Sequence, residues 1–583
     1  MGEERGRGVA IRKKMTEEIK SILTRIAGSE AFTVEPTPDQ KFGHYASNIA
    51  MRLAGKAGKA PIEVAKDLRE KIIAIDQGKT FEKIEIAPPG FLNFWFSKSV
   101  LRREFARMVR TGKKWGKPVM SQKSLVKSRQ VVVIDYSHPN IAKPMSVAHM
   151  RSTIIGAALV NIFKWSGWKV IGDNHLGDWG KQFGVLIAAY KQQQGKSDKR
   201  QGTISIDDLL KLYVDYSARM KADSALEEVT RRETKLLQDG NRDNVKIWKA
   251  FYKVSLAEFK KIYKILGVRF DYYLGESYYK AMLPGIISDA LDKGVAVKSE
   301  GAIVIPIEGK APFVIQKSDE AFLYATTDLA AAKYRAERFK PSLVLYVVDN
   351  GQSLHFEQLF GAVAKLGYGK GERLVHVKFG LILSEDMKKL STRAGRHISL
   401  EGVISEAIEK AAKVVHEKRP DLSIRERVKI ARAVGIAALK FNDLSQNRQS
   451  DIAFRWESML SFEGQSAPYI MYTYTRLRSI LRKAKVPSKW NPEAVESEGD
   501  FALVLLLARF PEALEKARST FFPHYLAEYL VALARGVNRF YETEPVLTAD
   551  APVKAARLRL IEAAGTTLCN GMKLLGITPL ERM

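Results

Sequence analysis

Cysteine is scarce in this sequence, long apolar runs are lacking, and glycine and proline are not enriched. The 583 residues include one cysteine, Cys569, which excludes an internal disulfide and any zinc site built mainly from cysteines, and fits a reducing compartment. No apolar run approaches the roughly 18 residues of a membrane-spanning helix, and the charged start of the chain lacks an apolar signal segment. The 41 glycines and 21 prolines are too few for a low-complexity or collagen-like chain. We therefore expect a folded, cytoplasmic protein with no membrane partner.

Acidic residues are also in short supply relative to basic ones. The chain has 65 Asp and Glu against 94 Lys and Arg, which gives a formal net charge of +29. A hydrophobic fraction of 46% is ordinary for a folded protein with a sizeable core, so the charge does not mark a disordered tail. The excess charge indicates either a well-solvated surface or a nucleic-acid partner, because clustered Lys and Arg release counterions from phosphates. Net charge alone does not choose between the two.

The middle of the chain carries the pattern of a βαβ unit. Residues 131–134 form a β-branched apolar run typical of a buried parallel strand. A loop at 137–144, a helical pattern at about 147–165 and a second strand at 168–171 follow. Ligands of such sheets bind at the carboxyl ends of the strands.

Other segments differ in composition from this unit. Residues 91–96 predict a short strand that is apolar on both faces, and the basic stretch 101–130 predicts a linker or an RNA-facing hinge. Residues 343–348 predict another buried strand. Beyond about residue 404 the chain is almost wholly helical, and the segments with a clear helical pattern are 425–444, 467–484, 501–519 and 526–541.

A set of ordered motifs resembles the arginyl family of class I aminoacyl-tRNA synthetases. The string PNIAKP at 139–144, followed by HMRSTIIG at 149–156, resembles the nucleotide-binding segment of that family. The string KLSTRAG at 389–395 resembles the mobile second signature of class I enzymes. The other similar segments are 42–48, 174–184, 324–330, 346–355, 464–479 and 579–583.

This resemblance implies a fold of the α/β plus all-α class. It comprises an α+β N-terminal module that binds tRNA (1–115), a class I Rossmann-type catalytic domain (116–403) with insertions at about 190–245 and 271–322, and a C-terminal helical anticodon-binding bundle (404–583). It implies an arginine–tRNA ligase that forms arginyl-adenylate from L-arginine and ATP with Mg²⁺. The arginyl group then passes to the 3′-terminal adenosine of tRNA(Arg). It further implies that tRNA binds before activation, that the protein is a monomer, and that no zinc is bound.

The resemblance also assigns roles to individual residues. The catalytic side chains are Lys143, His149, Lys389 and Arg393. The ATP-binding residues are Ser146, Ala148, His149, Asn174, His175, Gly177, Asp178, Gln182, Lys389 and Ser391. The arginine-binding residues are Asp135, Asn140, Tyr324, Asp328 and Gln352. The tRNA-binding residues are Phe42, Asn48, Tyr469, Arg476, Arg478, Arg482 and Met583.

The chemistry suits these residue types. A helix that begins just after a strand offers backbone N–H groups to phosphates, and basic groups on two loops stabilise the charge that develops on pyrophosphate. The planar guanidinium of arginine needs carboxylates in fixed geometry, which Asp135 and Asp328 supply. Basic residues at 476–489 and the tyrosines before them suit phosphates and unpaired bases.

Each assignment has a structural alternative. By itself, His149 is more often a satisfied structural residue and the 389–395 segment a solvated turn. Asp135 and Asp328 could each cap a helix or pair with a structural arginine. The tyrosines at 469–474 could be core residues, and this alternative is open above all for Tyr472.

The first class I signature, normally His-x-Gly-His, reads Ser-Val-Ala-His at 146–149. Ser146 keeps a donor but loses reach, and Ala148 adds a methyl group where a nucleotide base needs close approach. An alternative function is therefore a catalytically weak synthetase paralogue that binds tRNA or arginine. A synthetase of neighbouring specificity, such as cysteine, is a third option, against which the lack of a Cys/His zinc set argues.

Overall fold

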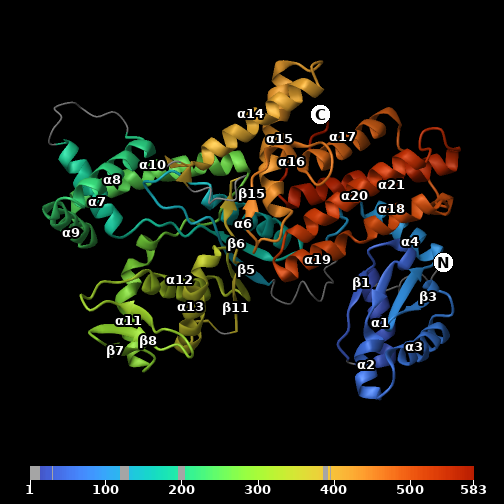
Figure 1. Cartoon of the computed structure of the whole chain (residues 1–583), viewed down its shortest axis with the longest axis horizontal. Coiled ribbons are helices and arrows are strands. Elements are labelled where there is room, and N and C mark those ends of the chain that lie inside the picture. Colours follow the sequence, from blue (N-terminus) through green and yellow to red (C-terminus); the bar gives the residue numbers. More distant parts are fainter. Residues whose placement is uncertain are drawn as a thin grey trace, which may run out of the picture.

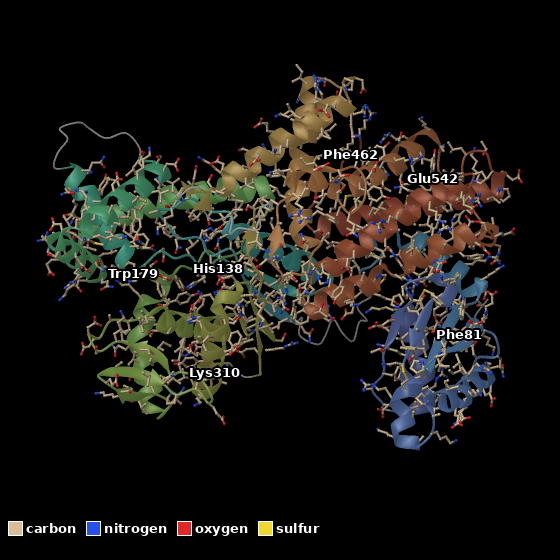
Figure 2. The ribbon with its side chains drawn as sticks, viewed as in Figure 1. Phe81, His138, Trp179, Lys310, Phe462 and Glu542 are labelled. Carbon is tan, nitrogen blue, oxygen red and sulfur yellow. The ribbon has the colours of Figure 1, made fainter. Side chains whose placement is uncertain are left out.

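The computed structural model describes residues 14–28, 30–118, 130–194, 204–369, 371–384, 392–393 and 396–583. Figure 1 shows an N-terminal α/β part at one end, a central parallel sheet with two insertions at the other end, and a long C-terminal helical part between and above them. Figure 2 places His138 near the middle of the molecule, whereas Lys310 and Glu542 lie at its surface. No helix in these described ranges has both the length and the apolar character needed to span a membrane.

The N-terminal part is a four-stranded antiparallel sheet covered by helices. Its strands lie in the order β1-β2-β4-β3. Their bounds are β1 Val34–Pro36, β2 Tyr45–Ser47, β3 Phe81–Ala87 and β4 Phe91–Phe96, and the helices are α1 Met15–Ala27, η1 Gln40–Phe42, α2 Ile49–Ala57 and α3 Pro61–Asp76. Strand β4 confirms the prediction for 91–96: Leu92, Phe94 and Phe96 are buried, and the Phe81 ring of β3 packs against Phe94 and Phe96.

The basic stretch at 101–130 is not a solvated hinge where the structure describes it. Helix α4 (Lys98–Thr111) and η2 (Gly112–Lys114) occupy its first half. Arg102 donates to the carbonyl of Val495 at 3.0 Å and pairs with Glu493 at 2.7 Å. The prediction of a linker there was wrong because apolar residues recur at helical spacing and give α4 a buried face that docks on the C-terminal helices. Residues 119–129 lie outside the described part of the chain.

The central sheet is parallel, in the order β11-β10-β5-β6. Its strands are β5 Val131–Asp135, β6 Lys169–Asp173, β10 Leu343–Tyr346 and β11 Arg373–His376, and its helices are α6 Ala148–Trp165, α12 Tyr324–Phe339, η4 Asn350–Gln352 and α13 Ser353–Leu366. Asp135 lies opposite both Asp173 and Tyr346, so the carboxyl ends of three strands are level. The chain leaves β5 toward one edge of the sheet and β10 toward the other, which opens a crevice between them.

Two insertions extend this sheet. The first is helical and contains α7 Lys181–Gln194, α8 Ile206–Met220, α9 Ser224–Gln238 and α10 Arg242–Leu266. The second contains η3 Glu276–Met282, α11 Leu283–Asp292, β7 Val297–Ser299, β8 Ala302–Ile305 and β9 Phe313–Gln316. Short strands β12 Ile382–Leu383, β13 Thr392–Arg393, β14 Arg396–His397 and β15 Ile452–Ala453 join the sheet to the helical part.

The C-terminal part is a helical bundle with a continuous apolar core. Its helices are α14 Leu400–Lys418, α15 Ile424–Leu444, α16 Trp456–Leu460, α17 Ala467–Lys483, η5 Pro492–Ala494, α18 Glu498–Ala508, α19 Phe510–Thr520, α20 His524–Thr543 and α21 Ala551–Leu574. The predicted single helix at 501–519 is two helices, since Pro511 has no N–H to continue α18 and instead stands in the first turn of α19.

The N-terminal part contacts the bundle through polar groups. Glu512 of α19 accepts hydrogen bonds from the hydroxyl of Tyr45 (2.9 Å) and the backbone N–H of Thr16 (3.0 Å). Arg509 donates to the carbonyl of His44 at 2.7 Å. The N-terminal part is therefore docked on the start of α19.

Candidate functional site

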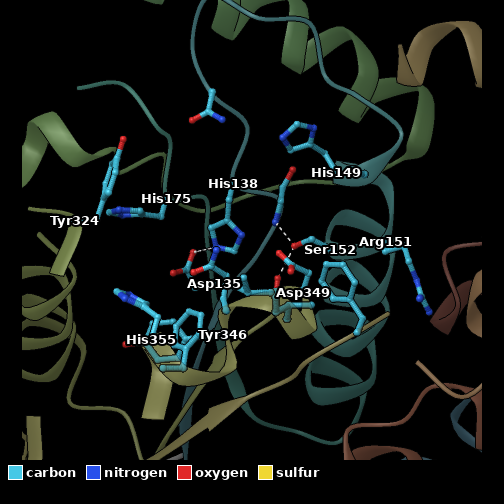
Figure 3. A pocket seen from close by; sticks show the side chains of 18 of the residues that line it. Asp135, His138, His149, Arg151, Ser152, His175, Tyr324, Tyr346, Asp349 and His355 are labelled. Atoms are coloured by element: carbon cyan, nitrogen blue, oxygen red, sulfur yellow. Dashed lines mark hydrogen bonds and ion pairs between the residues drawn. The ribbon is translucent and has the colours of Figure 1, made fainter. Parts of the chain in front are cut away.

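A cavity of about 600 Å³ opens at the carboxyl ends of β5 and β10. It lies in the crevice that the strand order creates, and Figure 3 shows its side chains converging from the β5 loop, the start of α6 and the start of α12. All five expected arginine-binding residues line it: Asp135, Asn140, Tyr324, Asp328 and Gln352. Of the expected ATP-binding residues, Ala148, His149 and His175 line it.

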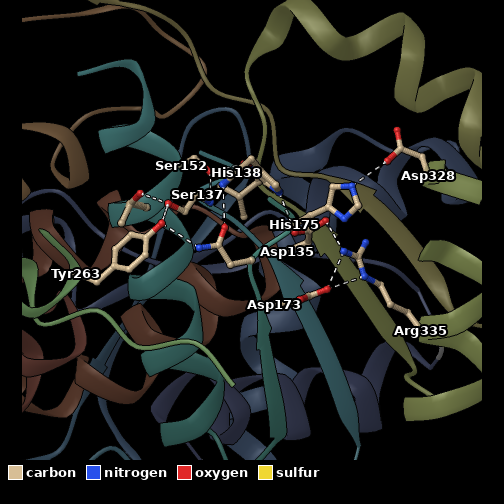
Figure 4. A network of polar contacts seen from close by, with 12 residues as sticks. Asp135, Ser137, His138, Ser152, Asp173, His175, Tyr263, Asp328 and Arg335 are labelled. Carbon is tan, nitrogen blue, oxygen red and sulfur yellow. Dashed lines mark hydrogen bonds and ion pairs between the residues drawn. The ribbon is translucent and has the colours of Figure 1, made fainter. Parts of the chain in front are cut away.

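The loop after β5 has a strained backbone that its neighbours hold in place. Ser137 and His138 have φ angles of 86° and 51°, in the left-handed region that non-glycine residues seldom adopt. The N–H of Ser137 donates to the Ser152 hydroxyl at 2.8 Å, and the N–H of His138 donates to the Asn174 side chain at 3.2 Å (Figure 4). Strain of this kind persists only where surrounding contacts fix the backbone.

Asp135 lines the cavity, but its carboxylate is already bound. Its two oxygens lie 2.7 Å from the Arg335 guanidinium and 2.8 Å from Nε2 of His138. Burial raises the pKa of Asp135, but Arg335 and His138 outweigh that effect and hold it well below its usual range. Arg335 also donates to Asp173 at 2.9 Å (Figure 4). The structural-arginine alternative is therefore realised at Asp135.

Asp328 is the carboxylate that faces the cavity from α12. One of its oxygens lies 2.6 Å from Nε2 of His355, and the other lies 3.9 Å from His175. Tyr324 precedes it by one helical turn and is 64% exposed, so the two side chains share the face toward the cavity, as the spacing predicts.

Glu276, in η3, is a further carboxyl of the cavity lining that the sequence analysis did not predict. Burial raises its pKa to about 9, and the nearby charges of Asp178 and Asp328 add to the rise. Asp178 orients η3 by accepting hydrogen bonds from the N–H (2.8 Å) and hydroxyl (2.7 Å) of Ser277. No local pattern marks Glu276, because only the tertiary fold brings it to the site. His138 lies in the loop just after β5, and its place at the carboxyl end of a parallel strand is a signal that could have found it.

The start of α6 presents His149 to the cavity. Nδ1 of His149 accepts the backbone N–H of Ser146 at 3.0 Å, and the Ser146 hydroxyl lies 3.0 Å from the same nitrogen. A neutral imidazole held this way carries its proton on Nε2. Ala148 stands at the first, exposed position of the helix. Ser146 thus orients His149 without lining the cavity itself.

Several expected ligands lie behind the cavity wall. Asn174 donates to the Tyr263 hydroxyl at 2.9 Å, and Gln182 donates to the carbonyl of Gly177 at 3.4 Å. Gly177 packs so closely on Asn140 that a Cβ would lie 2.0 Å from its amide oxygen. These residues and Asp178 therefore support the residues that line the cavity.

Of the expected basic groups Lys143, Lys389 and Arg393, the structure describes the side chain of Lys143, and it lies away from the cavity lining. Nζ of Lys143 lies 4.3 Å from the centre of the Tyr213 ring of α8, and Lys143 does not line the cavity. Lys389 and Ser391 lie outside the described residues, and for Arg393 only its place in β13 is described.

The expected tRNA-binding residues lie on two distant surfaces. In the N-terminal part, Phe42 is 52% exposed, whereas Asn48 accepts the N–H of Thr33 at 2.8 Å. In α17, Arg478 pairs with the Glu581 carboxylate at 2.7 Å and Arg482 donates to the Glu581 carbonyl at 2.8 Å.

Aromatic contacts complete the second surface. Arg476 lies over the Tyr541 ring at 4.2 Å, and the Tyr469 hydroxyl accepts from Asn538 at 2.9 Å. Tyr472 is 48% exposed, so the core alternative is wrong for it, whereas it holds for the buried Tyr474. Arg419 donates to the carbonyl of Met583, which fixes the end of the chain beside α14.

Within the described ranges, the His, Cys, Asp and Glu side chains form no group of three or more that could hold a metal ion.

The chain matches three family models in succession. They are the Arginyl tRNA synthetase N terminal domain (residues 10–96), the tRNA synthetases class I (R) catalytic domain (117–456) and the DALR anticodon binding domain (470–583). The arginine–tRNA ligase of Fusobacterium nucleatum is 38% identical over 552 residues, which cover 94% of each chain. That of Chloroflexus aurantiacus is 40% identical over 542 residues, 92% of this chain and 93% of the relative.

The structure is also similar to solved arginyl-tRNA synthetase structures. Arginyl-tRNA synthetase from Plasmodium falciparum superposes with a TM-score of 0.84 at 27% identity, covering 99% of this chain and 100% of that one. The Thermus thermophilus enzyme shares the fold, with a TM-score of 0.80 at 24% identity and coverage of 98% and 99%. The chain therefore belongs to the arginyl-tRNA synthetase family of class I aminoacyl-tRNA synthetases.

Proposed function

We propose that this protein is an arginine–tRNA ligase that activates L-arginine with ATP and transfers it to the 3′-terminal adenosine of tRNA(Arg). The observation that carries the proposal is one cavity that is lined both by the carboxyls of Asp328 and Glu276 and by the N-terminus of α6. A guanidinium suits two carboxylates, and a helix N-terminus suits phosphates.

The amino acid is held between α12 and the β5 loop in this proposal. Its guanidinium lies against Asp328 and Glu276, with Tyr324 covering the open side. Its α-amino end lies near Asn140, and Gln352 closes the cavity from the β10 side. Asp135 acts indirectly: it accepts a hydrogen bond from His138 and thereby keeps that imidazole facing the substrate.

ATP binds across the start of α6. His149 donates from Nε2 to a phosphate or to ribose, and Ser146 keeps the ring in position. Lys143, Lys389 and Arg393 neutralise charge on the departing pyrophosphate, and Ser391 binds ATP. Mg²⁺ arrives with ATP; because it binds mainly through substrate phosphates and keeps several waters, it needs no dedicated set of protein ligands.

The tRNA spans the molecule from the N-terminal part, with Phe42 and Asn48, to the surface around α17. Class I membership implies attack by the 2′-hydroxyl of the terminal adenosine on the adenylate. We further propose that the chain acts as a monomer in the cytoplasm, with domain limits near 115 and 403 and with no bound zinc.

The alternative of a catalytically weak paralogue gains no support. The relatives compared carry the ligase name over nearly their full length. The substituted Ser146 retains two contacts to His149, which are the contacts that orient the ring.

ATP–pyrophosphate exchange with arginine, measured with and without tRNA, tests the proposal. We expect exchange that requires arginine and is stimulated by tRNA. Pyrophosphate exchange that is equally fast without arginine would contradict the proposed activity. Exchange that is equally fast without tRNA would contradict the proposed dependence on tRNA.

A further inference from the structure

One buried lysine of the C-terminal helices reaches into the catalytic part. Lys440 of α15 is 4% exposed, and its Nζ donates to the carbonyls of Leu266 (2.5 Å) and Gly576 (2.6 Å). Leu266 is the last residue of α10, and Gly576 follows the end of α21. Carbonyls at helix C-termini attract cations, so the ammonium joins the ends of two helices from different parts of the chain.

The same turn of α10 holds the active-site loop. The Tyr263 hydroxyl, three residues before Leu266, lies 2.8 Å from the Ser137 hydroxyl and accepts a hydrogen bond from Asn174 at 2.9 Å (Figure 4). Ser137 is one of the residues of that loop with a positive φ angle, and Asn174 binds the backbone of another, His138.

The segment just after α10 fixes the neighbouring strand ends. The carbonyl of Arg269 accepts the Tyr136 hydroxyl at 2.9 Å, and the Phe270 ring lies 4.3 Å from the Tyr136 ring. The Asp271 carboxylate accepts the N–H of Gly172 at 2.8 Å. Residues 263–271 thus hold the carboxyl ends of β5 and β6 in place.

We infer that Lys440 is a positioning residue for the active-site loop at 136–142, acting from the C-terminal helices through the last turn of α10. The inference rests on the proposed function, since arginine activation is its principal readout. Lys440 touches no part of the cavity, so its effect on the reaction passes through Leu266 and Tyr263.

A contribution to the stability of the helical bundle does not by itself explain why a lysine occupies position 440. Its only hydrogen-bond partners in the described structure are the two carbonyls, and burial without a carboxylate partner lowers its pKa to about 8. A buried charge without a counter-ion is costly, and an apolar side chain of similar length would fill the same space. The contact does, however, set the position of α10.

The test compares Lys440→Met and Tyr263→Phe with Asn161→Ala as the matched control. Asn161 of α6 donates to the carbonyls of Lys573 (3.4 Å) and Leu574 (3.3 Å), so it also joins the catalytic part to the end of α21, but in the described structure it makes no hydrogen bond to α10. Each variant is assayed for kcat and KM in arginine-dependent pyrophosphate exchange and for tRNA affinity. Binding of tRNA with wild-type affinity shows that a variant has folded.

Lys440→Met should lower kcat by up to roughly 10², the cost of a small misplacement of reacting groups, while tRNA affinity and the KM for ATP stay close to wild type. Tyr263→Phe should lower kcat similarly. The double variant should be little worse than either single variant, because both changes act on one turn of α10. Asn161→Ala should keep wild-type kcat.

Wild-type kcat in Lys440→Met would overturn the inference. It would also be overturned if kcat of the double variant fell by the product of the two single-variant losses. Should Lys440→Met fail to fold, Lys440→Gln takes its place, and wild-type kcat in that variant would overturn the inference equally. Wild-type protein without arginine-dependent exchange would refute the proposed function instead. Hydrogen exchange at 136–142 then decides the inference: faster exchange in the Lys440 variant than in Asn161→Ala supports it, and equal exchange overturns it.

Discussion

Arg335 of α12 and Asp135 at the end of β5 form an ion pair of 2.7 Å beneath the active-site cavity. Both side chains are buried, and Arg335 also holds Asp173 of the neighbouring strand. One guanidinium therefore ties α12 to two strand ends at the point where the substrate is expected.

Replacing Arg335 with methionine should destabilise the protein strongly. It leaves two buried carboxylates without their partner, a change that costs about 3–5 kcal/mol. The urea midpoint of the central part reports the loss. Lys333→Met, which breaks a surface pair with Glu337 on the same helix, is the control and should change stability little. Equal midpoints for the two variants would contradict the role of Arg335.

Arginine binding should release a proton from Glu276. The empty site keeps this carboxyl protonated at neutral pH, because its pKa is raised to about 9, and an incoming guanidinium favours the ionised form. Arginine affinity should therefore rise from pH 6.5 to 8.5. Calorimetry in buffers of different ionisation enthalpy measures the release, which Glu276→Gln should abolish. Equal proton release in wild type and variant would exclude Glu276 from guanidinium binding.

Restoring the usual signature with Ser146→His and Ala148→Gly should leave the activation rate nearly unchanged. Ser146 already orients His149, and the Ala148 methyl group sits at an exposed position. By contrast, His149→Ala should lower kcat by roughly 10²–10³ through loss of a donor to the transition state. Pyrophosphate exchange measures both. A large gain from the double change would revive the weak-paralogue alternative.

Neutralising Arg478, Arg482 and Lys483 together should weaken tRNA binding. Each lost phosphate contact should flatten the slope of log affinity against log salt by about 0.7–0.9. Glu581→Gln is the opposite control, because it removes the carboxylate that pairs with Arg478 and should strengthen binding. Filter binding across a salt series measures both slopes. If the salt dependence of tRNA affinity is the same in the triple variant and the wild type, these three residues belong to a solvated surface and do not contact tRNA phosphates.

Acid should loosen the N-terminal part through His44. Burial lowers the pKa of His44 to about 4, and the Arg509 charge adds to this, whereas the unfolded chain titrates near 6.5. The contribution of neutral, buried His44 to the free energy of unfolding is therefore complete above pH 6.5 and is lost as pH falls toward 4, because the unfolded chain binds the proton first. Between pH 7 and 4.5 the wild type should lose about 2–3 kcal/mol more stability than His44→Asn. Parallel pH dependence of the two proteins would contradict this.

The sequence predicts the parts of the site that depend on local pattern. The β-branched run at 131–134, the helix after it and the alignment of Tyr324 with Asp328 all follow from periodicity or motif, and the structure confirms them. The position of Lys143 against Tyr213 cannot be predicted from the sequence pattern, because Tyr213 belongs to α8, in an insertion that only the tertiary fold brings close to Lys143.

Long-range burial accounts for the other differences. Glu276 becomes a site residue through the tertiary fold, which no spacing in the sequence reveals, whereas His138 follows Asp135 by three residues in the loop after β5. The occupation of Asp135 by Arg335 joins residues that lie two hundred positions apart. Motifs thus locate the site, whereas the charges within it depend on tertiary pairing.

Aminoacylation of total tRNA with labelled arginine, with a panel of other amino acids in parallel, tests the central claim most directly. The account predicts ATP-dependent esterification of arginine to tRNA and none of comparable rate with any other amino acid. Failure to charge arginine, or preferential charging of a different amino acid, would contradict it.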